Sequence, residues 1–189
     1  MGARAVPRSE PAEVAPVLTP VQYAVLGLLQ QAPAHGYELQ RAFSDGGDLG
    51  AVAHVEQPTL YAVLKDLAVR GLIEGTETRE GLRPPRTVYA LSPEGQRLLD
   101  LWLRAPVQRL REVRLDFLLK VYFARRRGDR RLVRTLVDAQ IRACHDYLAA
   151  LEARAAERSP DDFAYLVIES RTSAARGTLE WLRDYRGRL

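Results

Sequence analysis

Residues 57–73 read QPTLYAVLKDLAVRGLI, and this stretch decides the fold of the chain. Its apolar residues recur at the spacing of one helix face: Leu60, Val63, Leu64 and Leu67. Pro58 suits the first position of a helix, and Gly71 suits the position just past its end. The spacing therefore predicts a helix with one buried side that ends at Gly71 and leads directly into a strand.

The segment after this helix has the pattern of a two-stranded ribbon. Leu72-Ile73 opens a strand, residues 74–85 are polar and rich in Gly and Pro, and residues 87–91 (TVYAL) favour a second strand. Three arginines lie in or beside the turn: Arg79, Arg83 and Arg86. A helix followed by a ribbon with a basic tip is the arrangement that a winged helix-turn-helix presents to DNA.

Two further helices are expected upstream of residue 57. Thr19-Pro20-Val21-Gln22 has the pattern of a capping box, and apolar residues then repeat at helical spacing as far as Leu29. A second short helix begins at His35-Gly36 and closes at Asp45-Gly46-Gly47. Three helices followed by a ribbon is the winged-helix order, in which the third helix enters the major groove. On that helix Ala62 and Lys65 lie opposite the apolar stripe.

With these motifs in view, the chain resembles the PadR family of bacterial transcriptional regulators. The resemblance rests on several motifs in the same order: LGLL at 26–29, HGYEL at 35–39, PTLY at 58–61, GLI at 71–73 and RPPRTVYALSPEG at 83–95. Downstream, DFLLKVYFA at 116–124 is similar to the C-terminal domain of the longer, virulence-activator subfamily. The likeness spans residues from about Leu18 to the C-terminus.

The resemblance implies a sequence-specific DNA-binding regulator, most simply an effector-responsive repressor that binds a pseudo-palindromic operator as a homodimer. The expected DNA contacts are Tyr37, Gln57, Pro58, Thr59, Tyr61, Lys65, Arg79, Arg83 and Arg86. Some members of the family bind planar aromatic effectors, so a small aromatic or hydrophobic effector is a further expected partner, with Trp102 as its candidate contact. From the residues alone, a place in the core or in a dimer seam is favoured for Trp102, and effector contact is the alternative.

Charge alone leaves a second function open. The chain has a net charge of +4, but residues 18–91 hold six Lys/Arg against eight Asp/Glu. The basic excess lies instead in residues 107–127. DNA binding would therefore depend on where Lys65 and the wing arginines are placed, not on bulk charge. The acidic residues favour the alternative of a winged helix that binds a protein partner and no DNA.

The sequence divides into a disordered leader (1–17), a winged helix-turn-helix domain (18–105) and a helical dimerisation domain (106–189). We expect a helix over 107–126 that is apolar on nearly all sides at 115–123, a coiled-coil-like seam from Val133 to Leu151, and a last helix capped by Ser159-Pro160-Asp161-Asp162. That last helix carries one apolar side: Phe163, Leu166, Val167, Ser170, Ala174, Gly177 and Trp181.

These helices carry more apolar surface than a small three-helix unit can hide, which favours a homodimer; the alternative is a monomeric helical subdomain folded onto the winged helix. The residues expected in the dimer interface are Leu110, Phe117, Leu118, Val121, Val137, Ile141, Cys144, Leu148 and Trp181. The fold class is accordingly mainly α with a small β-ribbon.

Other chemistry finds little support in the sequence. A single cysteine excludes an internal disulfide, and the absence of a long apolar run or a signal-peptide pattern predicts a cytoplasmic protein. The three histidines, at 35, 54 and 145, are not at metal-ligand spacings, so no metal or cofactor is expected. Asp161-Asp162 fits helix-start charge, and Arg125-Arg126-Arg127 a solvated helix end. Without a constellation of acid, base and nucleophile, the protein is not expected to be an enzyme.

Overall fold

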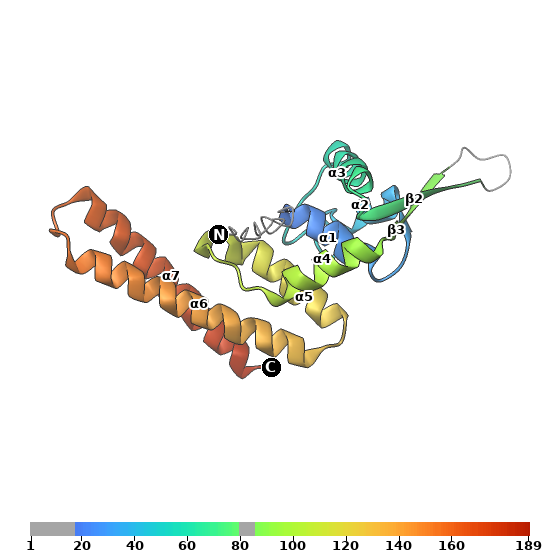
Figure 1. Cartoon of the computed structure of the whole chain (residues 1–189). Helices are drawn as coiled ribbons and strands as arrows, with labels where there is room; N and C mark the ends of the chain where they lie inside the picture. The colour runs from blue at the N-terminus through green and yellow to red at the C-terminus, as the bar shows by residue number, and fades with distance from the viewer. Residues whose placement is uncertain (1–17, 80–85) are drawn as a thin grey trace, which may run out of the picture.

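The computed structural model describes residues 18–79 and 86–189, which form an N-terminal winged helix followed by a helical C-terminal region (Figure 1). The expected leader at 1–17 and the wing residues Arg83, Pro84 and Pro85 lie outside the described residues. The elements are α1 (Pro20–Leu29), β1 (Ala34–His35), α2 (Gly36–Ala42), α3 (Gln57–Val69), β2 (Ile73–Thr78), β3 (Arg86–Leu91), α4 (Pro93–Arg104), the 3-10 helix η1 (Leu110–Arg114), α5 (Asp116–Arg126), α6 (Arg130–Ala156) and α7 (Phe163–Gly187).

The helix starts lie where the capping residues predict them. The Thr19 hydroxyl accepts from the Gln22 backbone N–H at 3.3 Å, and the Gln22 side chain accepts from the Thr19 N–H at 2.7 Å, so the capping box is confirmed. The Ser92 hydroxyl caps α4 by accepting from the Gly95 N–H at 3.0 Å. Such caps satisfy backbone donors that have no partner within the helix, and they depend only on local sequence.

The β-ribbon is part of a three-stranded antiparallel sheet in the order β1-β3-β2. β2 and β3 pair from Ile73↔Leu91 to Thr78↔Arg86, as the two-stranded pattern predicted. The third strand, β1, was not expected; it is two residues long and pairs Ala34 with Tyr89. Such a short strand has no alternation for a sequence pattern to show, which is why the sequence did not predict it.

The N-terminal core forms around the predicted stripe of α3. Leu60, Leu64 and Leu67 are fully buried, which confirms the helical spacing. α1 supplies Ala24, Val25, Leu26 and Leu29, α2 supplies Leu39, and α4 adds Leu98, Leu99, Trp102 and Leu103. Two further members of this core, Leu119 and Phe123, come from α5, so the N-terminal core does not end with α4.

The single helix expected over residues 107–126 is wrong. The structure has η1 and α5 in its place, separated at Leu115, whose φ of −121° and ψ of −69° are not helical. Before η1, the backbone of Val107 is held by the Gln140 side chain, which accepts from its N–H at 2.9 Å and donates to its carbonyl at 3.1 Å. These long-range bonds replace the helical ones, and local sequence does not report them.

α6 and α7 form a long antiparallel pair that projects from the rest of the molecule (Figure 1). α7 begins after Asp162, as the capping pattern predicted, and the seam expected on α6 packs against α7 of the same chain. The side of α7 that is buried is Ile168, Ala175, Leu179 and Leu182. The side that the sequence singled out remains open, with Phe163 79%, Leu166 56% and Trp181 38% exposed.

Helix α5 is apolar all round because it packs on both sides within one chain. Leu119 and Phe123 join the N-terminal core, whereas Phe117, Val121 and Ala124 join the C-terminal core with α6 and α7. Its all-round apolar character therefore does not require a second chain. None of the described helices is long and apolar enough to cross a membrane.

Candidate nucleic-acid interface and C-terminal groove

The outer side of α3 presents polar and aromatic side chains to solvent. Within the first three turns the exposed residues are Gln57, Pro58, Thr59, Tyr61, Ala62 and Lys65. This side contains one cation and no carboxylate between positions 57 and 65. A helix that buries one stripe and leaves a polar, cationic side uncovered has the geometry needed to enter a major groove.

Two exposed tyrosines extend this surface towards α2. Tyr37, in the first turn of α2, is 69% exposed, and Tyr61 on α3 is 43% exposed. The Tyr61 ring lies against Gly36, where an added Cβ would be 3.0 Å from the ring atoms. The start of α2 and the outer side of α3 therefore lie next to each other, and both tyrosines are available to bond phosphate or bases.

Several carboxylates of the domain are already partnered, and one of them lies on α3. Asp66 accepts from the Gln22 side chain at 2.7 Å and is 2.9 Å from the Arg70 guanidinium. Asp48 is 3.1 Å from the Arg126 guanidinium, on the side of the domain that faces α5. These contacts compensate part of the acidic excess, whereas Glu56, just before α3, remains exposed.

The wing projects away from the domain (Figure 1) and carries arginines at the end of the paired region. The Thr78 hydroxyl donates to the Arg86 carbonyl at 3.1 Å, next to the last ladder pair. Arg79 and Arg86 are both exposed. The paired strands thus place two guanidiniums at one end of the ribbon, and Arg83 lies in the part of the wing that is not described.

Trp102 lies in the core, which is the interpretation that the sequence favoured, and does not form an open platform for an effector. It is 8% exposed, stacks on Tyr23 with ring centroids 4.6 Å apart, and donates from Nε1 to Asp116 at 3.0 Å. The Lys120 ammonium lies 4.9 Å from its ring centroid. The indole is therefore enclosed between α1, α4 and α5.

A buried lysine beside Trp102 was missed at the level of sequence. Lys120 is 2% exposed; its ammonium donates to the Ala105 carbonyl at 2.8 Å and lies 3.4 Å from the Asp116 carboxylate. Burial lowers the pKa of Lys120, and the nearby Asp116 opposes that shift. The sequence does hint at this pair, since Asp116 and Lys120 are four residues apart within the otherwise apolar stretch 115–123.

Four of the residues expected in the dimer interface lie in the chain's own core. Phe117, Val121, Val137 and Cys144 are at most 8% exposed, so they cannot contact a partner without rearrangement. Burial also raises the pKa of the Cys144 thiol. The other expected interface residues are partly buried or exposed: Leu110, Leu118, Ile141, Leu148 and Trp181. The pattern identified apolar positions correctly, but the chain itself covers many of them.

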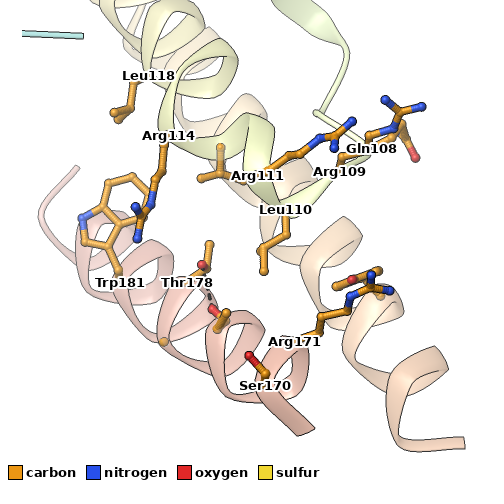
Figure 2. A pocket seen from close by; sticks show the side chains of 14 residues that line it. Gln108, Arg109, Leu110, Arg111, Arg114, Leu118, Ser170, Arg171, Thr178 and Trp181 are labelled. Carbon is orange, nitrogen blue, oxygen red and sulfur yellow. Dashed lines mark hydrogen bonds between the residues drawn. The ribbon is translucent and has the colours of Figure 1, made fainter. Parts of the chain in front are cut away.

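A groove of about 1060 Å³ lies between η1, the start of α5, and the open side of α7 (Figure 2). Its apolar lining includes Leu110, Val113, Leu118, Ala174 and Trp181. Four arginines also line it: Arg109, Arg111, Arg114 and Arg171. The sequence shows the basic excess of residues 107–127 but does not indicate a groove there. The facing wall of the groove comes from α7, more than fifty residues further along the chain.

No group of three or more His, Cys, Asp or Glu side chains suited to a metal ion occurs among the described residues. The arrangement instead offers two kinds of surface. The N-terminal one is polar, aromatic and cationic, and the C-terminal one is an apolar groove with a basic lining.

Comparison with known proteins assigns the two halves of the chain. Residues 25–101 match the transcriptional regulator PadR-like family, and residues 113–189 match the virulence activator alpha C-terminal domain. The negative transcriptional regulator PadR of Bacillus subtilis is 26% identical over 173 residues, which cover 87% of this chain and 94% of that protein.

Two crystal structures of Bacillus subtilis PadR, one in complex with operator DNA and one with p-coumaric acid, are each 24% identical to this chain. They cover 89% and 88% of it, and 97% and 93% of their own chains, with TM-scores of 0.45 and 0.39. The two matched domains together span most of the sequence in the order that its motifs predicted. The chain therefore belongs to the PadR-like family of transcriptional regulators, in the form that carries a virulence-activator-type C-terminal domain.

Proposed function

We propose that the protein is a cytoplasmic transcriptional repressor that binds a pseudo-palindromic operator as a homodimer, without catalytic activity of its own. The observation that carries the proposal is the outer side of α3, where residues 57–65 expose one lysine, one tyrosine and no carboxylate. The family supports this function, and so does the similar Bacillus subtilis protein, whose name describes a negative regulator.

In this proposal α3 reads bases and the wing holds the DNA backbone. Thr59 and Tyr61 lie on the outer side of α3, where their side chains reach base edges in the major groove, and Lys65 on the same side contacts a phosphate. Arg79 and Arg86 at the end of the ribbon contact phosphates or a narrow minor groove, for which the guanidinium is suited. Asp66 does not oppose this contact strongly, because Gln22 and Arg70 already bind its carboxylate.

The dimer contact is assigned to the open side of α7 and the groove beside it. Near the start of α7 an apolar, acidic surface is formed by Asp161, Asp162, Phe163, Leu166 and Glu169, all of them exposed. The groove offers the complement, an apolar lining with four arginines. A second copy of the chain thus supplies an apolar surface for the apolar lining of the groove and carboxylates for its arginines. Two such contacts related by a twofold axis would close the dimer.

A dimer gives the winged helices a geometric advantage. Two recognition helices about 34 Å apart can read successive major grooves of one duplex face. Linking two modules in this way commonly raises affinity by about 10²-fold or more over one module. We also propose that the protein responds to a small aromatic or hydrophobic effector. Because Trp102 is enclosed, that effector does not bind at Trp102.

The proposal is tested by fluorescence anisotropy with two labelled duplexes of equal length, one from the region upstream of the protein's own coding sequence and one unrelated. We expect the upstream duplex to bind at least about 10³-fold more tightly at physiological salt. Equal affinity for both duplexes, with strong salt dependence, would mean non-specific attraction only. No binding to either duplex would favour the alternative, a winged helix that binds a protein partner.

A further inference from the structure

Helix α5 packs against α1 so closely that only glycine fits at the point of contact. Gly27, in the middle of α1, faces the ring of Phe123, and a Cβ added at Gly27 would lie 2.6 Å from Cδ1 and Cε1 of that ring. Ordinary carbon–carbon contacts are about 3.5–4.0 Å. Phe123 is 1% exposed, so its ring has little room to retreat. The glycine of the LGLL motif therefore fixes how near α5 can approach the winged helix.

Polar contacts at the end of α5 close the same junction. The Arg126 guanidinium donates to the Gln31 side chain at 2.6 and 3.0 Å and to Asp48 at 3.1 Å. The Tyr122 hydroxyl also donates to Asp48, at 3.1 Å. These bonds tie α5 both to the segment that follows α1 and to the segment between α2 and α3.

Arg127 makes a second set of bonds to different elements. Its Nε donates to the Gln30 side chain at 2.6 Å, and its Nη1 is 2.7 Å from the Asp100 carboxylate on α4. Gln30 donates to Gln96 at 2.8 Å, which in turn donates to Asp100 at 2.9 Å. Together with Arg126, this network fixes the rotation of α5 about its axis as well as its distance from α1.

The opposite side of α5 belongs to the C-terminal core. Phe117, Val121 and Ala124 pack there with residues of α6 and α7, which carry the surface assigned to dimerisation. One helix is therefore wedged between the part that contacts DNA and the part that contacts the second copy. A change in the position of α5 on α1 therefore changes the angle between the winged helix and the α6–α7 pair.

We propose that the docking of α5 on α1, through Gly27 and Phe123 and the arginines Arg126 and Arg127, sets the distance between the two recognition helices and so selects the half-site spacing of the operator. This inference rests on the proposed function. Gly27 and Phe123 act as positioning residues, since neither is exposed to DNA. Their effect on recognition passes through the geometry of the dimer.

The test compares the full-length chain with Gly27→Ala, which inserts one methyl group into the contact, and with the control Gly46→Ala, where an added Cβ meets nothing within 4 Å. Affinity is measured for a single half-site and for duplexes whose two half-sites are moved apart or together by one or two base pairs. We expect the wild type and the control to share one sharp spacing optimum. Gly27→Ala should keep half-site affinity within about twofold but lose roughly tenfold or more at that optimum.

Two further variants separate positioning from stability. In Gly27→Ala with Phe123→Leu, the smaller side chain makes room for the added methyl, and we expect the original optimum to return. If Gly27→Ala alone does not fold, Arg126→Ala with Arg127→Ala loosens the same junction, with the exposed Arg125→Ala as control. An unchanged spacing profile, or an equal loss on half-site and full operator, would overturn the inference.

A distance measurement in the absence of DNA separates a failure of the docking inference from a failure of the proposed DNA-binding function. Spin labels at the exposed positions Val69→Cys and Arg142→Cys report the distance between the winged helix and the α6–α7 pair, with labelled chains diluted in unlabelled protein. We expect Gly27→Ala to shift or broaden this distance and Gly46→Ala to leave it unchanged. An unchanged distance in Gly27→Ala overturns the docking inference. A wild type that binds no duplex overturns the proposed function, whatever the distances show.

Discussion

Helices α3 and α7 both carry apolar residues at helical spacing, yet they leave opposite kinds of surface uncovered. On α3 the stripe of Leu60, Leu64 and Leu67 is completely buried, and what remains outside is mostly polar. On α7 one apolar side packs on α6, and a second side with Phe163 and Trp181 stays open. A polar, cationic surface suits nucleic acid, and an apolar one suits another protein. From this contrast we propose that α3 contacts DNA and that the open side of α7 contacts a second chain.

The largest effect is expected from breaking the closed side of α3. Leu64→Ala should lower the free energy of unfolding by roughly 2–5 kcal/mol, because Leu64 is fully buried and its removal leaves a cavity. Val69→Ala, on the same helix but 80% exposed, should change it by about 0.5 kcal/mol or less. Urea unfolding of both variants measures the difference; similar losses would show that the stripe is assigned to the wrong face.

Charged substitutions on the open side of α7 should weaken dimerisation while leaving the stability of the single chain unchanged. Phe163→Arg with Leu166→Arg should leave the fold stable, since both side chains are exposed in the single chain. It should weaken dimerisation by about 10²-fold, because two added cations would replace the apolar contact and face the four arginines of the groove. Sedimentation equilibrium gives the dimer dissociation constant. Val69→Arg, at an exposed apolar residue on α3, is the matched control and should dimerise like the wild type.

On the polar side of α3, Lys65→Ala should weaken operator binding by roughly tenfold without changing dimerisation or stability. The loss of one phosphate contact should also reduce the slope of log affinity against log salt by about one unit. Titrations at several salt concentrations measure both quantities. An unchanged affinity and slope would remove Lys65 from the DNA contact.

The smallest effect is expected at the wing. Arg86→Ala should lower affinity by about threefold for all duplexes alike, because a backbone contact carries no sequence information. Competition between the operator and single-base variants gives the base preference, which should be preserved. A changed base preference with intact non-specific binding would mean that the wing reads sequence.

The elements set by local sequence were predictable. The capping box at Thr19, the cap at Ser92 and the start of α7 after Asp162 each depend on a few adjacent residues. The stripe of α3 was predictable for the same reason, since a period of 3.6 residues identifies a buried face when the helix has only one. The family motifs predicted that α3 and the wing contact DNA, and this stays a prediction.

What the sequence did not predict depends on contacts between distant residues. Helix α7 does carry the apolar side that the sequence indicated, but it also carries a second apolar side. Periodicity alone cannot tell which of the two packs on α6 and which stays exposed. For α5, an apolar surface all round was consistent with a second chain, whereas the structure covers it from two sides of the same chain. The arginine lining of the groove likewise needs the tertiary fold.

The most direct measurement of the central assignment is the composition of the complex with DNA. Duplexes selected by the full-length protein from a random library would be footprinted, and the mass of the complex determined by sedimentation. The account predicts two chains per duplex and two protected half-sites whose centres are about 10 base pairs, or one helical turn, apart. It also predicts that Phe163→Arg with Leu166→Arg reduces the complex to one chain on one half-site. Selection of no duplex, or a full two-site complex from that variant, would contradict it.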